Sequence, residues 1–320
     1  MGLTSSRSTG AAGATLARLA LVCLVVHSAM SVFSAYAFST FLYGPPPAWL
    51  QTPTNQQIMR ISWTYGPATT VVFGAFAALL HATGRFGTRR ALTIFALAFT
   101  ISLGSELLGT ATGYPFGPYS YSGMLGYKVG GLVPFNIPTS WFYMLYCSLA
   151  ICGRLLPVRD DARTKAVWAV VAGLVLTAWD VSMDPAMVKT FHWMWNLPPT
   201  AEQSALQRIF VSDAFYGMPL SNWIGWLLTG TVVARVILAV APPSAFARLV
   251  SPSNFPLALY AVNGVLPIAI CLRNGLWWAA VLGAVAMAVP LALAIRAGSP
   301  MRAADAESRR SMGGVAVAGD

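Results

Sequence analysis

The segment ELLGTATGYPFGPYSYSGMLGYKVGGLVPFNIPTSW, residues 106–141, lies between two apolar runs and differs from both. It begins with Glu106 at the end of one run, then alternates glycine and proline with aromatic residues before the next run. Glycine and proline permit tight, non-helical backbone. Such backbone is tolerated at membrane depth only where protein buries it or where it lines a cavity. We therefore expect either a re-entrant loop with an interfacial aromatic belt or the roof of a ligand site, and we favour the roof.

The rest of the chain has the composition of membrane helices. Of its 320 residues, 56% are hydrophobic and only 9% are charged, and the mean hydropathy is +0.62. Soluble domains carry roughly a quarter of charged residues. The net charge is +10, but the basic residues lie between the apolar runs and form no patch, so no nucleic-acid partner is expected. The four cysteines lie in or beside apolar runs without CxxC spacing, which is typical of small buried side chains.

Eight apolar runs have about the length that spans a bilayer, roughly 20 residues each. They cover residues 16–42, 63–83, 91–109, 132–152, 166–187, 219–241, 254–272 and 275–296, and a proline-rich loop is expected at 45–57. The first run is longer than the core of a signal peptide, so we expect it to be retained as a helix. The predicted fold is all-α: a polytopic membrane helix bundle, one transmembrane domain over 16–296 between disordered tails at 1–15 and 297–320.

The basic residues predict the orientation of this bundle. With the N-terminus inside, fifteen of the 20 basic residues fall in inner segments. The five outer ones are Arg60, Lys128, Lys189, Arg208 and Arg273. Because positive charge is enriched in cytoplasmic loops, we expect both termini in the cytoplasm. For the location we expect the bacterial cytoplasmic membrane.

Acidic residues inside membrane segments are rare and usually functional. Glu106 and Asp180 are predicted near the outer ends of two helices, and Asp184 lies one turn beyond Asp180 on the same face. Asp213 precedes the next helix at the same level, so these acids are expected to gather beneath the aromatic segment. Alternatives stay open for each: Glu106 extends to the interface, Asp184 caps a short helix after its position before Pro185, and Asp213 is a cap or loop residue.

Other residues narrow the chemistry. Asn222 lies inside the start of an apolar run, where a buried amide needs partners and can orient a carboxylate or a water. The three histidines are too far apart in sequence for a di-iron site, and no Gly-rich dinucleotide fingerprint is present. DVSMD, residues 180–184, has the acid spacing of intramembrane prenyltransferases, but the second acidic motif of those enzymes is absent. We expect acid–base chemistry without metal or cofactor, or no chemistry, as in a lipid carrier or small transporter.

Two blocks of motifs resemble a known family. The first block is G-x-PFG-x-Y-x-Y-(x)3-LG at 113–126 with VP-(x)2-IP-(x)2-W at 133–141. The second is WD-(x)3-DP at 179–185, W-x-W at 193–195 and YGMPLSNWIGW at 216–226. Together they resemble the carotenoid biosynthesis membrane-protein family that contains the CruF-type carotenoid 1,2-hydratases, over about residues 90–230. Trp223 stands where a phenylalanine is expected, and Thr139 where a leucine is expected.

The resemblance implies addition of water across the terminal 1,2 double bond of an acyclic ψ-end carotenoid, giving a tertiary 1-hydroxy end group. This reaction needs a carboxylic acid kept protonated near neutral pH, which burial favours, and aromatic faces beside the cation. We assign Asp180 as the general acid, Asp184 or Glu106 as the base that orients water, and Asn222 as their hydrogen-bonding partner. The aromatic candidates are Tyr114, Tyr119, Trp179, Trp193 and Trp226.

The expected partners follow from the same resemblance. They are a long polyene substrate, membrane lipid and other enzymes of the carotenoid pathway, with no metal and no cofactor. The alternative function is a non-catalytic carrier of carotenoids or lipids, or a small transporter. An enzyme changes its ligand, whereas a carrier returns it intact.

Overall fold

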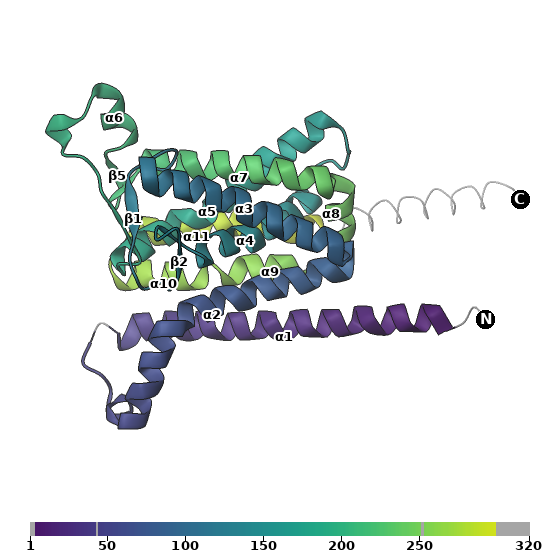
Figure 1. Cartoon of the computed structure of the whole chain (residues 1–320), viewed down its shortest axis with the longest axis horizontal. Coiled ribbons are helices and arrows are strands. Elements are labelled where there is room, and N and C mark those ends of the chain that lie inside the picture. Colours follow the sequence, from purple (N-terminus) through teal and green to yellow (C-terminus); the bar gives the residue numbers. More distant parts are fainter. Residues whose placement is uncertain (1–3, 43, 251–252, 299–320) are drawn as a thin grey trace, which may run out of the picture.

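The computed structural model describes residues 4–42, 44–250 and 253–298 (Figure 1). The long helices are α1 (Thr4–Thr40), α2 (Pro53–Phe86), α3 (Thr88–Thr112), α4 (Asn136–Leu155), α5 (Ala162–Lys189), α7 (Leu220–Val240) and α11 (Trp277–Ala297). The shorter ones are α6 (Ala205–Phe210), α8 (Pro243–Val250), α9 (Phe255–Val262) and α10 (Val265–Arg273), with 3₁₀ turns η1 (Ala48–Gln51) and η2 (Thr200–Glu202). This arrangement confirms the predicted all-α membrane bundle.

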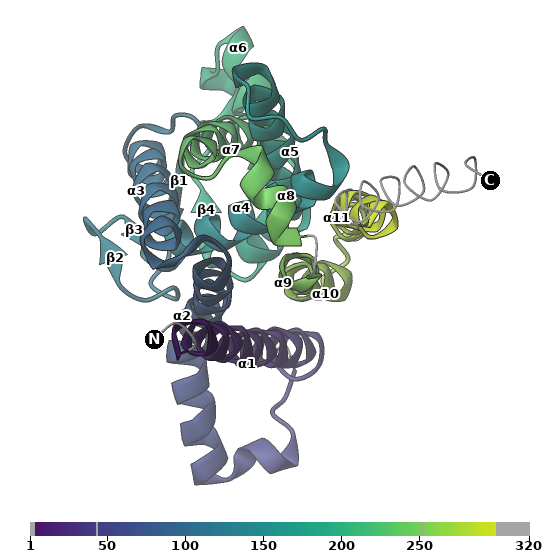
Figure 2. The same ribbon diagram turned by 90° about the vertical axis from the view of Figure 1, so that its right-hand side faces the viewer.

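Seven helices within the described ranges are long and apolar enough to cross a membrane, with α9 and α10 together forming the single span Phe255–Arg273. The remaining predicted run, 132–152, forms α4, which lies in the middle of the bundle against α2, α3, α5, α8 and α9 (Figure 2). Every residue of α4 except Ile137, Arg154 and Leu155 is buried. Because protein rather than lipid surrounds it, α4 can carry more polar and aromatic residues than a lipid-facing helix.

Local signals in the sequence set several helix ends. The Thr52 side chain accepts a hydrogen bond from the backbone of Asn55 and caps α2, and Asp161 does the same for α5 through Thr164. Gly113 ends α3 in the left-handed conformation with φ of 82°, which glycine adopts without steric cost. That ending turns the chain back toward the body of the bundle, so the following aromatic residues return to the end of α3.

The first two helices form an outer pair beside the main bundle. Helix α1 packs against α2 and α10, and the first turns of α2 run at a steep angle to the rest of that helix (Figure 1). Pro67 lies inside α2 and removes a backbone donor, which accounts for the bend. The proline-rich segment 45–57, predicted as a loop, contains η1 and the start of α2, so α2 begins ten residues before the predicted 63.

The ends of the chain differ in part from the prediction. Helix α1 begins at Thr4, so most of the segment predicted as a disordered tail is helical. The predicted C-terminal tail lies, apart from Ala297 and Gly298, outside the described residues. The start of α1 and the end of α11 lie on the same side of the bundle (Figure 1). Which side faces the cytoplasm stays a prediction.

Three short antiparallel ladders lie at the opposite end of the bundle (Figure 1). Strand β1 (Tyr119–Tyr121) pairs with β4 (Trp193–Trp195), β2 (Lys128–Val129) with β3 (Val133–Pro134), and β5 (Asp213–Phe215) with β6 (Met218–Pro219). The β1–β4 ladder connects the segment after α3 to the segment after α5. It therefore fixes how the two sequence blocks that carry the motifs meet.

Candidate functional site

Glu106 lies at the centre of a set of hydrogen-bond donors near the end of α3. It is only 3% exposed, so the alternative in which it extends to the interface is wrong. The hydroxyl groups of Tyr119 and Tyr121 both donate to its Oε2, Tyr121 at 2.8 Å. The Trp141 indole donates to Oε1 at 3.1 Å. Every one of these donors is neutral and comes from the segment 106–141.

The tyrosine hydroxyls at this site stay protonated. Burial raises the pKa of Tyr119 and of Tyr121 well above the usual range, and the neighbouring Glu106 carboxylate raises both further. A phenol that keeps its proton remains a hydrogen-bond donor at any physiological pH. The two tyrosines are therefore permanent donors to Glu106.

The second carboxyl, Asp184, lies inside α5. The helix continues through Pro185 to Lys189, so Asp184 is not the cap of a separate short helix. Its side chain is buried, and both oxygens accept indole hydrogen bonds: Oδ1 from Trp193 at 2.6 Å and Oδ2 from Trp195 at 3.0 Å. Two N–H donors aimed at one carboxyl group favour its ionised form.

Asp180 lies one turn earlier on α5 and is completely buried. Its Oδ2 accepts a hydrogen bond from the Asn222 amide at 2.7 Å, and that amide also lies 3.0 Å from the sulfur of Met218. Its Oδ1 has no hydrogen-bond partner among the described residues. Asn222 therefore has the partner that its position in an apolar run required, and Asp180 retains one free oxygen.

Aromatic rings surround these carboxyls. Trp226 on α7 stacks on Trp141, with ring centroids 4.5 Å apart and an angle of 19° between the planes, and it meets Trp179 edge-on at 6.0 Å. The buried Phe116 ring fits between Gly109 of α3 and Gly225 of α7, where an added Cβ would lie 2.7 Å and 2.5 Å from it. Glycine at both positions lets the loop insert between the two helices.

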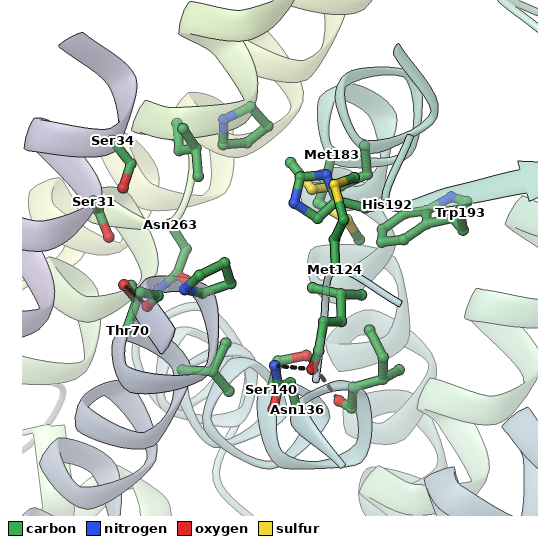
Figure 3. Close-up of a pocket in the computed structure, with 18 of the residues that line it drawn as sticks. Ser31, Ser34, Thr70, Met124, Asn136, Ser140, Met183, His192, Trp193 and Asn263 are labelled. Atoms are coloured by element: carbon green, nitrogen blue, oxygen red, sulfur yellow. Dashed lines mark hydrogen bonds between the residues drawn. The ribbon is translucent and has the colours of Figure 1, made fainter. Parts of the chain in front are cut away.

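The site opens into a cavity of about 530 Å³ between the outer pair α1–α2 and the main bundle. Figure 3 shows Ser31, Ser34, Thr70 and Asn263 on one side and Met124, Met183, His192 and Trp193 on the other. Most of the remaining lining is apolar or aromatic. This size and character are typical of a small-molecule site, for which typical volumes are roughly 300–1,000 Å³.

The structure brings most of the expected residues to this cavity. It is lined by Glu106, Tyr119, Trp179, Asp184, Trp193, Asn222 and Trp226. Asp180 is not among the lining residues but is joined to the wall through Asn222. Tyr114 is 76% exposed and lies outside the lining, because the chain turns at Gly113 and directs Phe116 inward instead, so the proposed site leaves it out.

Asp213 lies apart from the other acids. It is exposed, and its Oδ1 accepts a hydrogen bond from the Gly217 backbone at 2.8 Å within the β5–β6 turn. This is the loop role given above as its alternative. Residues 4–42, 44–250 and 253–298 contain no group of three or more His, Cys, Asp or Glu side chains placed to hold a metal ion.

Three donors were not singled out from the sequence: Tyr121, Trp141 and Trp195. The period-2 alternation of a strand was the available signal for two of them, since Tyr121 follows Tyr119, and Trp195 follows Trp193, at the strand spacing. Trp141 stands at the start of an apolar run, where tryptophan is common for interfacial reasons. No local pattern distinguishes it from a belt residue.

The chain resembles known proteins over most of its length. Residues 66–290 match the family described as "Carotenoid biosynthesis protein". The chain belongs to that family. The matched residues include the three carboxyl residues Glu106, Asp180 and Asp184, which we call the carboxyl site. They also include the segment 106–141, which we call the roof, and the part of α2 that follows Gly66.

Among curated proteins, the chain is similar in sequence to a bisanhydrobacterioruberin hydratase from Haloarcula japonica. It is 31% identical over 166 residues, which is 51% of this chain and 50% of the relative. The chain therefore aligns with about half the length of that relative. No solved structure matches this member of the carotenoid biosynthesis family.

Proposed function

We propose that this protein is a cofactor-independent carotenoid hydratase that adds water across the terminal 1,2 double bond of a ψ-end carotenoid. The product is a tertiary 1-hydroxy end group. The observation that carries the proposal is a set of buried carboxyls, held by neutral donors, beside a mostly apolar cavity. Family membership and the name of the curated relative support carotenoid hydration in general.

The reaction proceeds in two bond-forming steps. A carboxylic acid transfers its proton to carbon 2, and the π electrons of the double bond form the new C–H bond. This leaves a tertiary cation at carbon 1. A water oxygen then bonds to carbon 1, and the resulting oxonium releases one proton to a carboxylate. The net change is the addition of one water, and no electrons are exchanged with a cofactor.

The protonation of the carboxyls follows from their partners. The donors that contact Glu106, Asp184 and Asp180 are tyrosine, tryptophan and asparagine side chains, none of which carries a charge. Several bare carboxylates close together in an apolar interior are strongly unfavourable, so at least one keeps its proton. Asp180 is the best holder, since its Oδ1 accepts no hydrogen bond from the described residues.

The route of the proton refines the assignment made from sequence. Asp184 lines the cavity, whereas Asp180 lies behind the lining, one helical turn away. We therefore assign the proton at rest to Asp180 and its delivery to the ligand to Asp184, the pair acting as one acid. Glu106, on α3 and also in the lining, is then the base that takes the proton from the oxonium.

The aromatic residues have two roles in this scheme. The faces of Trp179 and Trp226 stabilise the developing cation, as tryptophan does for other cations within about 6 Å of its ring. The apolar lining from α1 and α2 accepts the polyene, which is dissolved in the membrane rather than in water. Opening between this outer pair and the bundle gives such a ligand access from the lipid.

The test is conversion by the purified protein in lipid or detergent. A ψ-end carotenoid, incubated without any added cofactor, is expected to yield a product heavier by one water. The Asp184→Asn protein should form it at least about a hundredfold more slowly at equal amounts of folded protein. Pigment that is bound tightly but recovered unchanged from the wild type would contradict the enzyme and favour the carrier.

A further inference from the structure

Two polar residues of α4 line the cavity without a role in the scheme above. Asn136 and Ser140 are one helical turn apart and therefore lie on the same face of α4. Figure 3 shows them side by side at the wall between the α1–α2 side and the side that carries Met124 and His192. Asn136 is only 1% exposed, so its amide needs partners inside the protein or the cavity.

The orientation of the Asn136 amide is fixed by a backbone contact. Its Nδ2 donates to the carbonyl oxygen of Leu125 at 3.0 Å, which only the nitrogen end of the amide can do. The carbonyl end, Oδ1, is buried and accepts no hydrogen bond from any residue described in the structure. A buried acceptor with a fixed direction and no protein partner in a cavity wall indicates a ligand that donates.

Ser140 supplies a second acceptor beside the first. Its hydroxyl donates to the carbonyl of Ile137 at 2.8 Å, which uses its single proton. The lone pairs of its oxygen therefore remain for a donor from the cavity. Two acceptors one turn apart complement a molecule with two O–H groups on one oxygen, and water is such a molecule, whereas a ligand hydroxyl has only one.

We propose that Asn136 and Ser140 hold the water molecule that is added to the substrate, an inference that rests on the proposed hydratase function. A water that donates both hydrogens to these acceptors directs its lone pairs into the cavity, where the cation forms. The water oxygen bonds to carbon 1 and becomes an oxonium. The O–H group of this oxonium that was hydrogen-bonded to the Ser140 oxygen then releases its proton to the Glu106 carboxylate. Glu106 is held by Trp141, the residue that follows Ser140.

Asn136 and Ser140 are thus positioning residues, and their loss should change the fate of the cation rather than its formation. A cation without a placed water loses a proton and returns to an alkene. In D₂O carbon 2 of this cation carries a new C–D bond, and deuterium remains there when a C–H bond of carbon 2 or of a methyl group on carbon 1 breaks instead, its electrons forming the alkene and its proton passing to a carboxylate or to water. The ratio of hydrated product to deuterated substrate therefore reports water placement, and a merely structural defect would lower both together.

The experiment compares Ser140→Ala and Asn136→Ala with Ser148→Ala in D₂O, at equal amounts of membrane-inserted protein. Ser148 is the matched control because it is also buried on α4, its hydroxyl donates to the Met144 carbonyl, and it is not among the residues that line the cavity. Loss of one hydrogen bond to the water should lower hydration about tenfold. We expect the hydrated-to-deuterated ratio to fall by that factor in the two cavity variants and to stay unchanged in Ser148→Ala.

Several outcomes would overturn the proposal. One is a ratio in Ser140→Ala equal to that of Ser148→Ala, and this variant decides the matter if Asn136→Ala fails to fold. Another is weaker binding of the 1-hydroxy product alone in the two cavity variants, with an unchanged ratio, since the two acceptors would then bind a ligand hydroxyl. A wild type that forms neither hydrated nor deuterated product contradicts the proposed function itself.

Discussion

Tyr119 lies directly opposite Trp195 in the antiparallel pairing of β1 with β4, and the centroids of their rings are 5.3 Å apart. Tyr119 donates to Glu106 on α3, and Trp195 donates to Asp184 on α5. The next pair, Tyr121 and Trp193, repeats the pattern with the same two carboxyls. Three residues of each strand therefore set the relative positions of two acids on separate helices.

This connection between the two carboxyls through the β1–β4 ladder predicts an effect on activity. Removing a single hydrogen-bond donor from the ladder should reduce activity without unfolding the protein. Trp195→Phe and Tyr119→Phe each remove one donor to a carboxyl while keeping a ring in place. A hydrogen bond to a charged group contributes about 1.5–3 kcal/mol, so a rate lower by tenfold or more is expected. Hydrated product per inserted protein is the measurement. Trp277→Phe, at an exposed tryptophan, is the control, and a normal rate in Trp195→Phe would contradict the coupling.

The helices and the acids could be predicted from the sequence because their signals are local. Apolar runs of bilayer length define the spans, and a carboxylate in such a run stands out by its cost. This cost identifies Glu106 and Asp180. The position of Asp184 inside a helix is harder to predict, because the local rule for a residue before proline favours a helix end. Packing of α5 against α7 and α11 keeps the helix intact through Pro185.

The partners of the acids could not be predicted, because they depend on contacts between distant segments. Strands β1 and β4 are only three residues long, and neither predicts the other from its own sequence. The wall formed by α1 and α2 carries no motif, since Ser31 and Thr70 look alike in a helix whether they face lipid or a cavity. The role of Asn136 likewise cannot be predicted from sequence, because it depends on the hydrogen bond to the Leu125 carbonyl that fixes the direction of its amide.

The orientation of the bundle gives a second prediction. Reporter fusions near residues 157 and 305 should report the cytoplasm, and fusions near 120 and 200 the opposite side, because fifteen of the 20 basic residues lie on the first side. The ladders of the carboxyl site would then lie toward the outer leaflet. A C-terminal fusion that reports the outside would contradict this orientation.

Close packing of the roof predicts a specific stability defect. In Gly225→Ala the new Cβ would lie 2.5 Å from Phe116, whose ring is fixed between two helices. Overpacking of this kind costs about 1–3 kcal/mol, so the melting temperature in detergent should fall. Phe116→Leu in the same protein should restore part of the loss. Gly104→Ala on α3, where an added Cβ meets nothing within 4 Å, is the control, and equal melting of both alanine variants would contradict the packing argument.

His192 predicts a pH dependence of stability. Burial lowers its pKa to about 4, and its Nδ1 lies 2.7 Å from the Thr190 hydroxyl. In the unfolded chain the value is about 6.5. Between these two values the unfolded state binds more protons, so stability falls as the pH is lowered from about 6.5 to 4 and changes no further below that. The full effect is about 3 kcal/mol.

The comparison of wild type with His192→Gln isolates this contribution from other titrating groups. Thermal unfolding of both proteins should be followed from pH 7 to pH 3.5. The wild type should lose more stability than the variant between about pH 6.5 and 4, and the two curves should run parallel below that range. Curves that are parallel throughout would show that His192 is protonated equally in both states.

The last prediction separates the roles of the carboxyls. Asp184→Asn and Asp180→Asn remove the acid pair, and loss of a positioned general acid typically costs about 10²–10⁴-fold in rate. Both should fold, because an amide is easier than a charge to hold in an apolar bundle.

In D₂O the Asp184→Asn and Asp180→Asn proteins should also stop deuterium from entering recovered carotenoid, since no cation forms. Glu106→Gln removes only the base, so hydration should fall while deuterium still enters. Asp213→Asn, at the exposed turn, should keep the wild-type rate. Deuterium entry at the normal rate in Asp184→Asn would refute its role as donor, and equal losses in all four with less inserted protein would indicate a structural network instead.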